Sequence, residues 1–460
     1  MISIKKIIVP VVLLLFVLNA CKVTQPFSTP VVKTDSLYRD VYGTDTTTIA
    51  QLSWKDVFSD TLLQKLINET IDNNLDLKIA YSRINEAEAS FLQSKAAFYP
   101  SVSGSAGITL NSSSNSNVLG QNATAHAYTA EIGASWEADI WGKLKSSKHA
   151  ALANLLQLQE NGNAVISKLV ADIALNYYHL LALDRELEVT RGTVQNWQSI
   201  VNIMKELKKA DVVTSAAIVQ SDAAKYATDA TIPDIIQNIR ETENMINFLA
   251  GKPAGPVARS SLDLQKGWTN INTGVPVQLL ANRPDVKAAE QNVRYYFELT
   301  NVARTYFYPS VTIAASGGYL TNNVFSGPVS LIGNFVGGLV QPVFNQRINK
   351  TRLEIAKAQQ QQALLNFQTS ILSSGKEVSD ALFSYQAAKD KQSIRSKQLI
   401  NLQKSVAYTE ELVKYGFANY TEVLNAQQNL LNGQLGEIND KQQELQSFVS
   451  LYNALGGGWK

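Results

Sequence analysis

The sequence predicts a mainly α-helical protein with a transmembrane β-barrel part, in which one helix-strand-strand-helix unit occurs twice. First, residues 97–102 (Ala-Phe-Tyr-Pro-Ser-Val) return as residues 306–311 (Tyr-Phe-Tyr-Pro-Ser-Val). Second, each copy opens a stretch in which apolar and polar residues alternate, as they do in a β-strand. Third, a very long helical pattern without proline follows each predicted pair of strands. A duplicated unit of this kind indicates the architecture before any single residue is interpreted.

Residues 1–20 have the pattern of a lipoprotein signal peptide. Two lysines precede the apolar run 7–18, whose length of about 12 residues suits a signal-peptide core and is short of the ~20 residues of a spanning helix. The run ends in Leu-Asn-Ala-Cys21, which resembles the bacterial lipobox, where a signal peptidase cuts before a lipidated cysteine. We predict that Cys21 is lipidated, against the alternative of a buried core cysteine, and that residues 21–60 form a lipid-anchored, extended leader. Lys22 after the cysteine, in place of Asp, favours passage to the outer membrane by analogy with enterobacterial sorting.

The first repeat is expected over residues 61–250. Its opening helical stretch contains Asp72-Asn73-Asn74, a candidate break between two helices. A proline then ends the helix, and two strands are predicted at about 100–110 and 128–138. In both strands small or polar residues alternate with apolar ones, so each strand has one apolar face and one polar face.

The second repeat is expected over residues 281–460, after a linker at 251–280 that is rich in Gly and Pro. Its strands are predicted at about 309–320 and 333–342. The third strand alternates clearly between apolar and polar residues, whereas the fourth is rich in Gly and has a weaker pattern.

Long helices and return helices follow both pairs of strands. The long helices are predicted at about Leu144 to Leu207 and Arg347 to Tyr415, and each would span roughly 100 Å at 1.5 Å per residue. A turn follows each one, and return helices are predicted at about Ala216 to Ala250 and Tyr420 to Ala454. Apolar residues on the first long helix recur at steps of three and four, as in laterally packed coiled-coil helices.

The predicted strands are typical of a membrane barrel. They are about ten residues long, apolar on one side, and have an aromatic residue near each end. The alternative is an ordinary amphipathic hairpin on a soluble core. Four strands cannot close a barrel, and open edges in lipid would leave backbone groups unpaired at several kcal/mol each. The chain is therefore expected to form an oligomer, and three copies would give a 12-stranded barrel, although the strand count alone does not select the number three.

Composition excludes several classes of function. The net charge is +2 with no basic patch, so no nucleic-acid partner is expected. One cysteine and three scattered histidines form no disulfide framework and no metal-ligand spacing. We also find no phosphate-binding loop and no nucleophile-base-acid set, so neither a cofactor nor an enzymatic activity is expected.

Four motifs occur in the order of a known family. The most specific are Leu279-Leu280-Ala281-Asn282-Arg283-Pro284-Asp285-Val286 and Leu451-Tyr452-Asn453-Ala454-Leu455-Gly456-Gly457-Gly458-Trp459. The others are Asp139-Ile140-Trp141-Gly142-Lys143 and Pro342-Val343-Phe344. Together with the lipobox and the repeat, they resemble the TolC-like outer-membrane efflux channel family, in its lipoprotein branch typified by OprM and NodT. The resemblance covers essentially the whole mature chain.

The resemblance implies a homotrimer whose 12-stranded barrel continues as a long α-helical coiled-coil barrel in the periplasm. It implies a passive exit duct for small molecules such as drugs and toxic compounds. The partners it implies are a periplasmic adaptor (membrane fusion protein), an inner-membrane RND-type pump and outer-membrane lipid. Two alternatives remain: a type I protein secretion duct of the same fold, and a structural coiled-coil lipoprotein without transport.

The stretch 415–426 resembles the periplasmic tip of the family, where two acidic residues three apart line the closed aperture. Glu422 matches the first of them, but Asn425 replaces the second, so we expect one carboxylate ring and weaker attraction of cations. Asn419 and Glu422 also have the spacing of a capping box, which is the alternative explanation. The tip turns are expected at Lys209 and Asp211, where the usual glycine is absent, and at Gly416 and Asn419.

Other motif residues are interpreted as structural. In Arg283-Pro284-Asp285, proline suits a first helical position and Asp suits a first turn, so this motif predicts a helix start. Trp136 and Trp141 are interpreted as interfacial aromatics where strand meets helix, against the alternative of a substrate contact.

Overall fold

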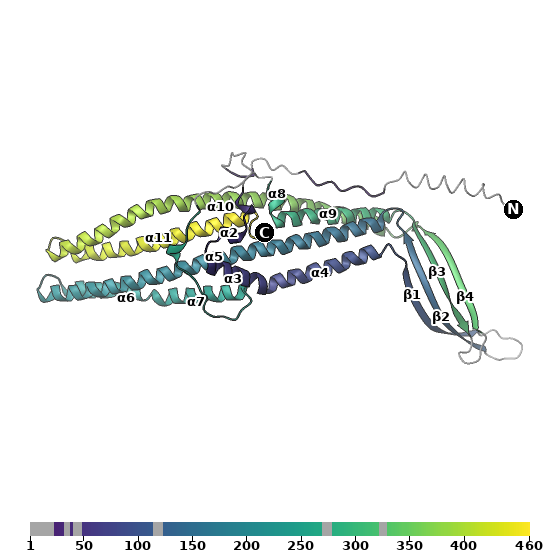
Figure 1. Ribbon diagram of the computed structural model, residues 1–460, viewed down its shortest axis with the longest axis horizontal. Coiled ribbons are helices and arrows are strands. Elements are labelled where there is room, and N and C mark those ends of the chain that lie inside the picture. Colours follow the sequence, from purple (N-terminus) through teal and green to yellow (C-terminus); the bar gives the residue numbers. More distant parts are fainter. Residues whose placement is uncertain (1–22, 32–36, 40–47, 114–122, 269–277, 322–328) are drawn as a thin grey trace. The chain divides into compact units, whose positions relative to one another are not determined.

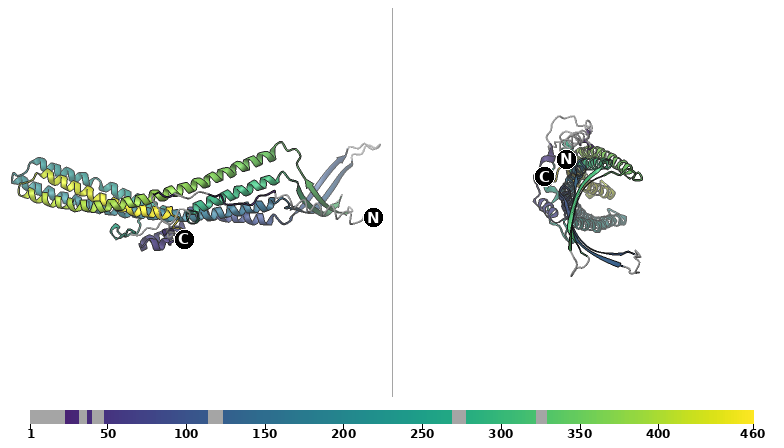
Figure 2. Two further views of the ribbon diagram at one scale, coloured as in Figure 1. Left: turned by 90° about the horizontal axis from the view of Figure 1, so that it is seen from above. Right: turned by 90° about the vertical axis from the view of Figure 1, so that its right-hand side faces the viewer.

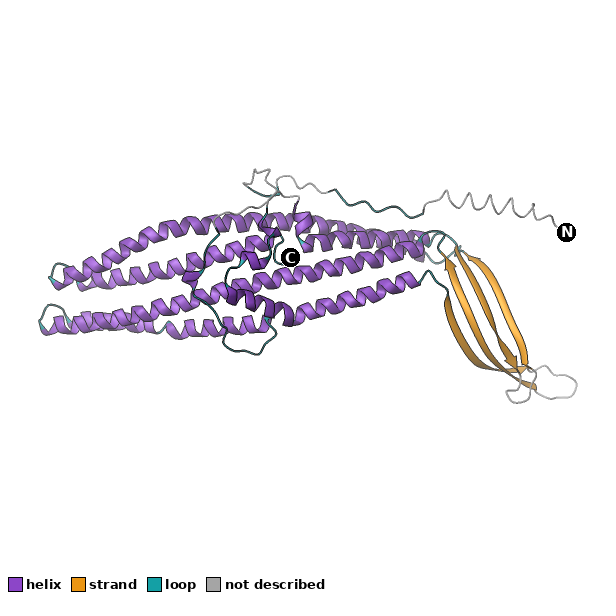
Figure 3. Cartoon of the chain, viewed as in Figure 1, coloured by secondary structure: helices purple, strands orange, loops and turns teal. Residues whose placement is uncertain are grey.

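The computed structural model describes residues 23–31, 37–39, 48–113, 123–268, 278–321 and 329–460. Cys21 and the signal peptide lie outside these residues, so lipidation stays a prediction. Figure 1 labels the elements, and Figure 3 separates helices from strands. The helices are η1 (Ile49–Gln51), α2 (Trp54–Val57), α3 (Thr61–Asn73), α4 (Leu75–Ala96), α5 (Lys143–Lys209), α6 (Ser215–Asp229), α7 (Ile232–Leu249), η2 (Leu262–Leu264), α8 (Leu279–Asn282), α9 (Pro284–Thr305), α10 (Ile348–Lys414) and α11 (Tyr420–Ala454).

The chain divides into two compact units that each draw on both repeats. Unit 1 contains residues 1–31, 83–159 and 288–368, and unit 2 contains the remaining residues. The division of the sequence at 61–250, 251–280 and 281–460 concerns repeats and linker, and it stays a prediction. Among the residues that the structure describes, no helix is both long and apolar enough to cross a membrane.

Unit 1 contains a curved antiparallel sheet, whose curvature is visible in Figure 2. All four predicted strands are present, but β2 (Ala123–Ala138) begins earlier than about 128 and β4 (Val329–Val340) begins earlier than about 333. Hydrogen-bonded pairing explains both differences, because it extends these strands into residues whose alternation is weak. Ala123 of β2 pairs with Ser113, and Val329 of β4 pairs with Thr321. The strands follow the order β1 (Ser101–Ser113), β2 (Ala123–Ala138), β3 (Ser310–Thr321) and β4 (Val329–Val340).

The strand register gives the sheet an apolar face and a polar face. Residues paired across an antiparallel sheet lie on the same face. One row of pairs is Val102, Ala134, Ala315 and Phe335, and the next is Ser103, Gly133, Ser316 and Asn334. The alternation predicted for the first three strands is confirmed. The register also assigns faces to the Gly-rich fourth strand, where the sequence pattern was weak.

The repeated motif lies where helix passes into strand, and both copies are fixed in the same way. The indole of Trp136, near the end of β2, donates to the Phe98 carbonyl at 2.9 Å. The amide of Gln341, just after β4, donates to the Phe307 carbonyl at 3.2 Å. In addition, Trp141 donates to the carbonyl of Pro309 at 2.7 Å. Both tryptophans therefore lie at strand-helix junctions, as the sequence predicts.

The first described segment of the leader, residues 23–31, lies against α9 within unit 1. The buried Asn301 side chain donates to the Gln25 carbonyl at 2.9 Å and accepts from the Gln25 N–H at 3.1 Å. The Phe27 ring packs edge-on against Phe297, with ring centroids 5.4 Å apart. These contacts hold residues 25–27 at a defined position on α9.

The core of unit 2 is built from the apolar stripe of α5. The buried members include Val170, Ile173, Tyr177, Leu180 and Leu181, at the three- and four-residue steps of a helix face. They pack with apolar residues of α2, α3, α7, α10 and α11. The lateral packing predicted for this helix is therefore confirmed.

Two predicted helix boundaries had different outcomes. The break at 72–74 is confirmed, because Asn74 separates α3 from α4 and its side chain accepts from the Leu77 N–H at 2.9 Å. The single return helix predicted at 216–250 is wrong: α6 ends at Asp229 and α7 begins at Ile232. Pro233 lies in the first turn of α7 and has no N–H to continue the hydrogen bonds of α6, which explains the break.

Candidate functional site at the helix tips

Two turns close the helical hairpins of unit 2, and they share one hydrogen-bond pattern. After α5, the N–H of Val212 donates to the Leu207 carbonyl at 2.9 Å. After α10, the N–H of Phe417 donates to the Leu412 carbonyl at 2.9 Å. Both bonds span five residues and end their helices as Schellman motifs.

The left-handed residue of each motif differs between the repeats. Gly416 has φ +76°, and Asp211 occupies the equivalent place with φ +56°. Only glycine takes this conformation without steric cost, but Asp tolerates it better than most residues. Lys208 Nζ lies 3.0 Å from the Asp211 carboxylate, an exposed pair worth little on its own. The missing glycine at the first turn therefore leaves the turn geometry unchanged.

The start of α11 places the predicted aperture residues on one exposed face. Asn419 caps the helix, since its side chain accepts from the Thr421 N–H at 3.2 Å. Glu422 lies in the first turn, and no hydrogen bond from the Asn419 N–H to its carboxylate occurs among the described residues, so only half of the capping box forms. Glu422 and Asn425 are exposed, whereas Val423 is buried on the other side. Their role in an aperture stays a prediction.

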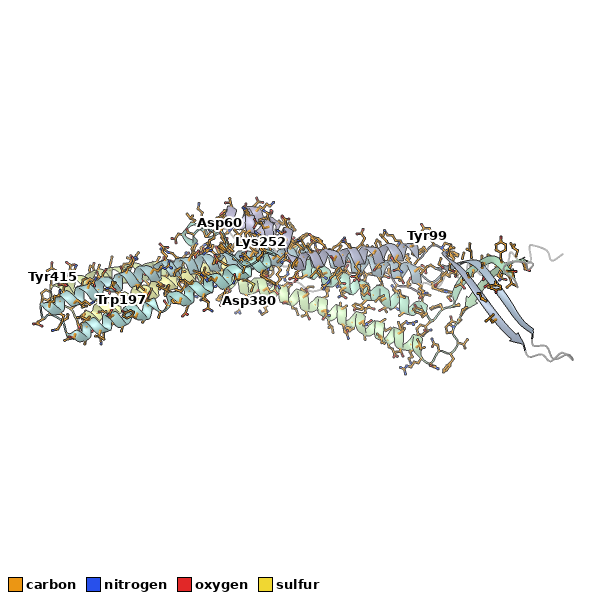
Figure 4. The ribbon with its side chains drawn as sticks, turned by 90° about the horizontal axis from the view of Figure 1, so that it is seen from below. Asp60, Tyr99, Trp197, Lys252, Asp380 and Tyr415 are labelled. Atoms are coloured by element: carbon orange, nitrogen blue, oxygen red, sulfur yellow. The ribbon has the colours of Figure 1, made fainter. Side chains whose placement is uncertain are left out.

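Behind the turns the two hairpins share an apolar cluster, which we call the tip core. Trp197 is its largest member and is 1% exposed. Figure 4 shows Trp197 further back along the helices than Tyr415, which lies at the end of the hairpins. This tryptophan was not among the functional residues predicted from the sequence. Its spacing with two other members, Ile200 and Met204, is nevertheless that of a helix face. The tip core consists of Trp197, Ile200, Met204, Ala217, Val413 and Val423.

Side-chain hydrogen bonds also join the helices at the tip. The Tyr420 hydroxyl on α11 donates to Gln220 Oε1 on α6 at 2.8 Å, which ties one hairpin to the other. Gln427 Nε2 donates to Glu410 Oε1 at 2.9 Å, which ties α11 to α10. A cavity of about 410 Å³ remains beside the tip core, between α5, α10 and α11. At the tips the two hairpins are thus joined by the buried tip core and by the bond between Tyr420 and Gln220.

The two most specific sequence motifs meet elsewhere in unit 2. Arg283, whose side chain is 10% exposed, pairs with Asp285 at 2.7 Å and Glu377 at 2.7 Å. Its guanidinium also donates to the Ala454 carbonyl at 2.9 Å. Trp459 Nε1 donates to the Asn282 carbonyl at 3.0 Å. Because α9 begins at the proline between Arg283 and Asp285, the predicted helix start is confirmed.

No group of three or more His, Cys, Asp or Glu side chains in the described residues is arranged to hold a metal ion. The features that stand out are structural: a sheet with one apolar face, and long helical hairpins with narrow turns at their ends. These are the parts of an outer-membrane channel. The sequence profile of the outer membrane efflux protein family matches residues 66–252 and 275–457, so the chain belongs to this family. The protein is an outer-membrane efflux channel.

Individual relatives agree with this assignment. The chain is 28% identical over 418 residues to the cation efflux system protein CusC of Escherichia coli, with 88% of each chain covered. It is 27% identical over 411 residues to SilC of Salmonella typhimurium, named a probable outer membrane lipoprotein, again with 88% of each covered. A crystal structure of CusC superposes with a TM-score of 0.85 at 25% identity, and covers 95% of this chain and 100% of that one.

Proposed function

We propose that three copies of this chain form the passive exit duct of a tripartite efflux system for small molecules. The observation that carries the proposal is the open sheet of unit 1. Its strand order leaves β1 and β4 as edge strands within a single chain. One face of the sheet is apolar, with exposed side chains such as Ile132, Leu331 and Phe335.

An apolar face requires lipid or a partner, and edge strands in lipid require pairing. Each unpaired backbone group in hydrocarbon costs several kcal/mol, so only closed barrels of strands are stable there. Pairing β4 of one copy with β1 of the next satisfies both edges. Three copies give twelve strands and match the homotrimer that the family resemblance implies.

The hairpin tips are the proposed docking surface for a periplasmic adaptor, which connects the duct to an RND-type inner-membrane pump. The turns present Lys209 and Asp211 on one hairpin and Gly416 and Asn419 on the other. Three copies of Glu422 would form one carboxylate ring at the aperture, while Asn425 adds no charge. The pump supplies the energy, and the duct opens when the contacts between hairpins loosen.

The proposed location is the outer membrane, with a lipid on Cys21 and the helical hairpins extending into the periplasm. The lipobox supports the lipid anchor, and the name of SilC agrees with it. Labelling with a palmitate analogue tests this point. Label should appear in the wild type and disappear in Cys21→Ser, and equal labelling of both would contradict lipidation at this residue.

Recording from purified protein in planar bilayers tests the channel itself. We expect small or rare conductances from the wild type, and larger ones from Glu422→Ala or from variants with loosened hairpin contacts. The absence of conductance from every one of these variants would contradict the duct and favour a structural lipoprotein.

Gene deletion tests the cargo. Deletion should increase sensitivity to several drugs or to cations, which are the cargo class named for CusC. Unchanged sensitivity together with the loss of one secreted protein would favour the type I secretion duct instead.

A further inference from the structure

The polar face of the sheet carries an isolated carboxylate at the middle of β2. The four strands contain no Lys or Arg, and their only acidic residues are Glu131 and Glu137. Glu131 alternates with Ile132, whose exposed side chain belongs to the apolar face. It therefore lies on the polar face, together with its cross-strand partners Ser105 and Gly318.

The neighbours of Glu131 on this face are uncharged and most are small, with Thr129 and Leu320 on one adjoining row. Gly318, directly opposite on β3, approaches so closely that an added Cβ would lie 2.7 Å from the Cα of Glu131. The neighbouring rows place Ser103, Gly133 and Ser316 on one side. None of these side chains is a cation, and none reaches far enough to cover a glutamate. No hydrogen bond or ion pair of the Glu131 carboxylate occurs among the described residues.

Glu137, six residues further along the same face, provides a contrast. Its carboxylate lies 3.0 Å from Nζ of Lys143 at the start of α5. This pair neutralises the charge of Glu137 where strand passes into helix. Among the residues that the structure describes, the charge of Glu131 has no such neighbour, so it acts on the ions and solutes in front of the polar face.

We propose that Glu131 is a charge-selective residue of the barrel lumen, which favours cations and cationic small molecules over anions. The proposal rests on the trimeric duct, since three copies of Glu131 at one level form a ring of carboxylates. An unpaired charge facing hydrocarbon is costly, whereas the same charge facing a water-filled lumen is not. Rings of Asp or Glu are a recognised way to make a pore prefer cations.

Bilayer recording in a salt gradient tests the proposal, with the cation-to-anion permeability ratio as the measured quantity. Each variant is recorded in the Tyr420→Phe background, which removes the hydrogen bond between the two hairpins and is expected to favour open tips. We expect Glu131→Gln to lower the ratio by about twofold at 0.1 M salt, and by more at 0.01 M, where screening weakens. Glu131→Lys should lower it further, and Glu131→Asp should leave it close to that of the wild type.

Two matched variants make the test specific. Glu137→Gln, which removes the carboxylate paired with Lys143, should change the ratio little. The double variant Ser105→Glu with Glu131→Gln moves the carboxylate to the paired position on β1, and it should restore the ratio. Recovery in the double variant also shows that any loss in Glu131→Gln came from charge and not from misfolding.

The outcomes separate this inference from the proposed function. Normal conductance with the same ratio in the wild type, Glu131→Gln and Glu131→Lys would overturn the role of Glu131 and leave the duct intact. A fall in the ratio that the double variant does not reverse would also overturn it. No conductance in any background would overturn the duct, and the inference with it.

Discussion

Tyr420 and Gln220 join two hairpins that belong to different repeats of the sequence. The phenol of Tyr420, in the first turn of α11, donates to the side-chain carbonyl of Gln220 on α6 across 2.8 Å. Both residues lie within one helical turn of the tip core, and a cavity of about 410 Å³ lies beside it. In a duct that opens by separating its hairpins, this bond would have to break.

Replacing Tyr420 by Phe removes this bond and keeps the ring. A net hydrogen bond of about 0.5–1.5 kcal/mol corresponds to a shift of roughly two- to tenfold in the closed-to-open equilibrium for each chain. We therefore expect Tyr420→Phe to raise open probability in bilayers. Gln220→Ala should have a similar effect, and the double variant should add little to either one.

Tyr408→Phe is a matched control, since Tyr408 is exposed on α10 and its hydroxyl makes no hydrogen bond among the described residues. Its open probability should equal that of the wild type. If the effects of Tyr420→Phe and Gln220→Ala on open probability were fully additive, this would contradict the proposal that the hydrogen bond between these two residues keeps the tips closed.

The two tip turns should respond in opposite ways to substitution at their left-handed residues. Asp211→Gly relieves the steric cost of φ +56° and should stabilise its turn by about 0.5–1 kcal/mol. Gly416→Ala places a Cβ at φ +76° and should destabilise its turn by about 1 kcal/mol. Hydrogen exchange of the Val212 and Phe417 amides reports each turn separately. If both substitutions changed amide exchange in the same direction, the left-handed backbone conformation would not determine the stability of these turns.

Arg283 should not tolerate replacement by lysine. The guanidinium binds both carboxylate oxygens of Asp285, the carboxylate of Glu377 and the Ala454 carbonyl at the same time. Lysine keeps the charge but cannot make this set of bonds, so Arg283→Lys should lower the free energy of unfolding by about 1–3 kcal/mol. Arg347→Lys is the control, because Arg347 and its partner Glu354 are exposed. A similar small loss in both variants would contradict a structural role for the motif.

From the hydrogen bonds of the Asp60 carboxylate we predict that the free energy of unfolding depends on pH. Its carboxylate accepts from the Tyr177 hydroxyl at 2.8 Å, from Gln265 Nε2 at 2.9 Å and from the Leu62 N–H at 2.9 Å, as well as from Ser260. Burial alone would raise the pKa of Asp60, but these hydrogen bonds outweigh it and hold the pKa below its ordinary value of 3.8. Figure 4 labels this residue.

A lowered pKa in the folded state means that the charged form stabilises the fold above the unfolded-state pKa, and that this stability is lost as the pH falls through the folded-state value. Denaturant unfolding should therefore show that the advantage of the wild type over Asp60→Asn is constant from about pH 7 to 5 and shrinks below about pH 4. An advantage that stays constant down to pH 2.5 would contradict this account.

Local patterns in the sequence were sufficient for much of the fold. Alternation predicted the strands and their faces, and a proline between Arg283 and Asp285 predicted the start of α9. Pro233 carried an equally local signal for the break between α6 and α7, but the surrounding helical pattern concealed it. The absence of the usual glycine from the first turn left its geometry open, and the structure shows Asp211 in the left-handed conformation, which Asp tolerates better than most residues.

The candidate site was less predictable, because its contacts join distant positions. Tyr420 and Gln220 are 200 residues apart, and neither has a local pattern that marks a partner. Trp197 follows a helix face, but its spacing alone does not show that it packs against α10 and α11. Glu131 could be placed on the polar face from alternation, whereas its isolation from any cation required the register of all four strands.

The bond between Trp459 and Asn282 joins residues 177 positions apart. Contacts of such separation form late, since the long intervening segment must be closed into a loop before the contact contributes any stability. During export β3 and β4, which lie between these two residues in the sequence, therefore emerge before Trp459 can close the second repeat onto Asn282. Incompletely folded chains with exposed strand edges are prone to aggregate. Biogenesis of this protein is thus expected to depend on chaperones that protect the nascent chain in the periplasm.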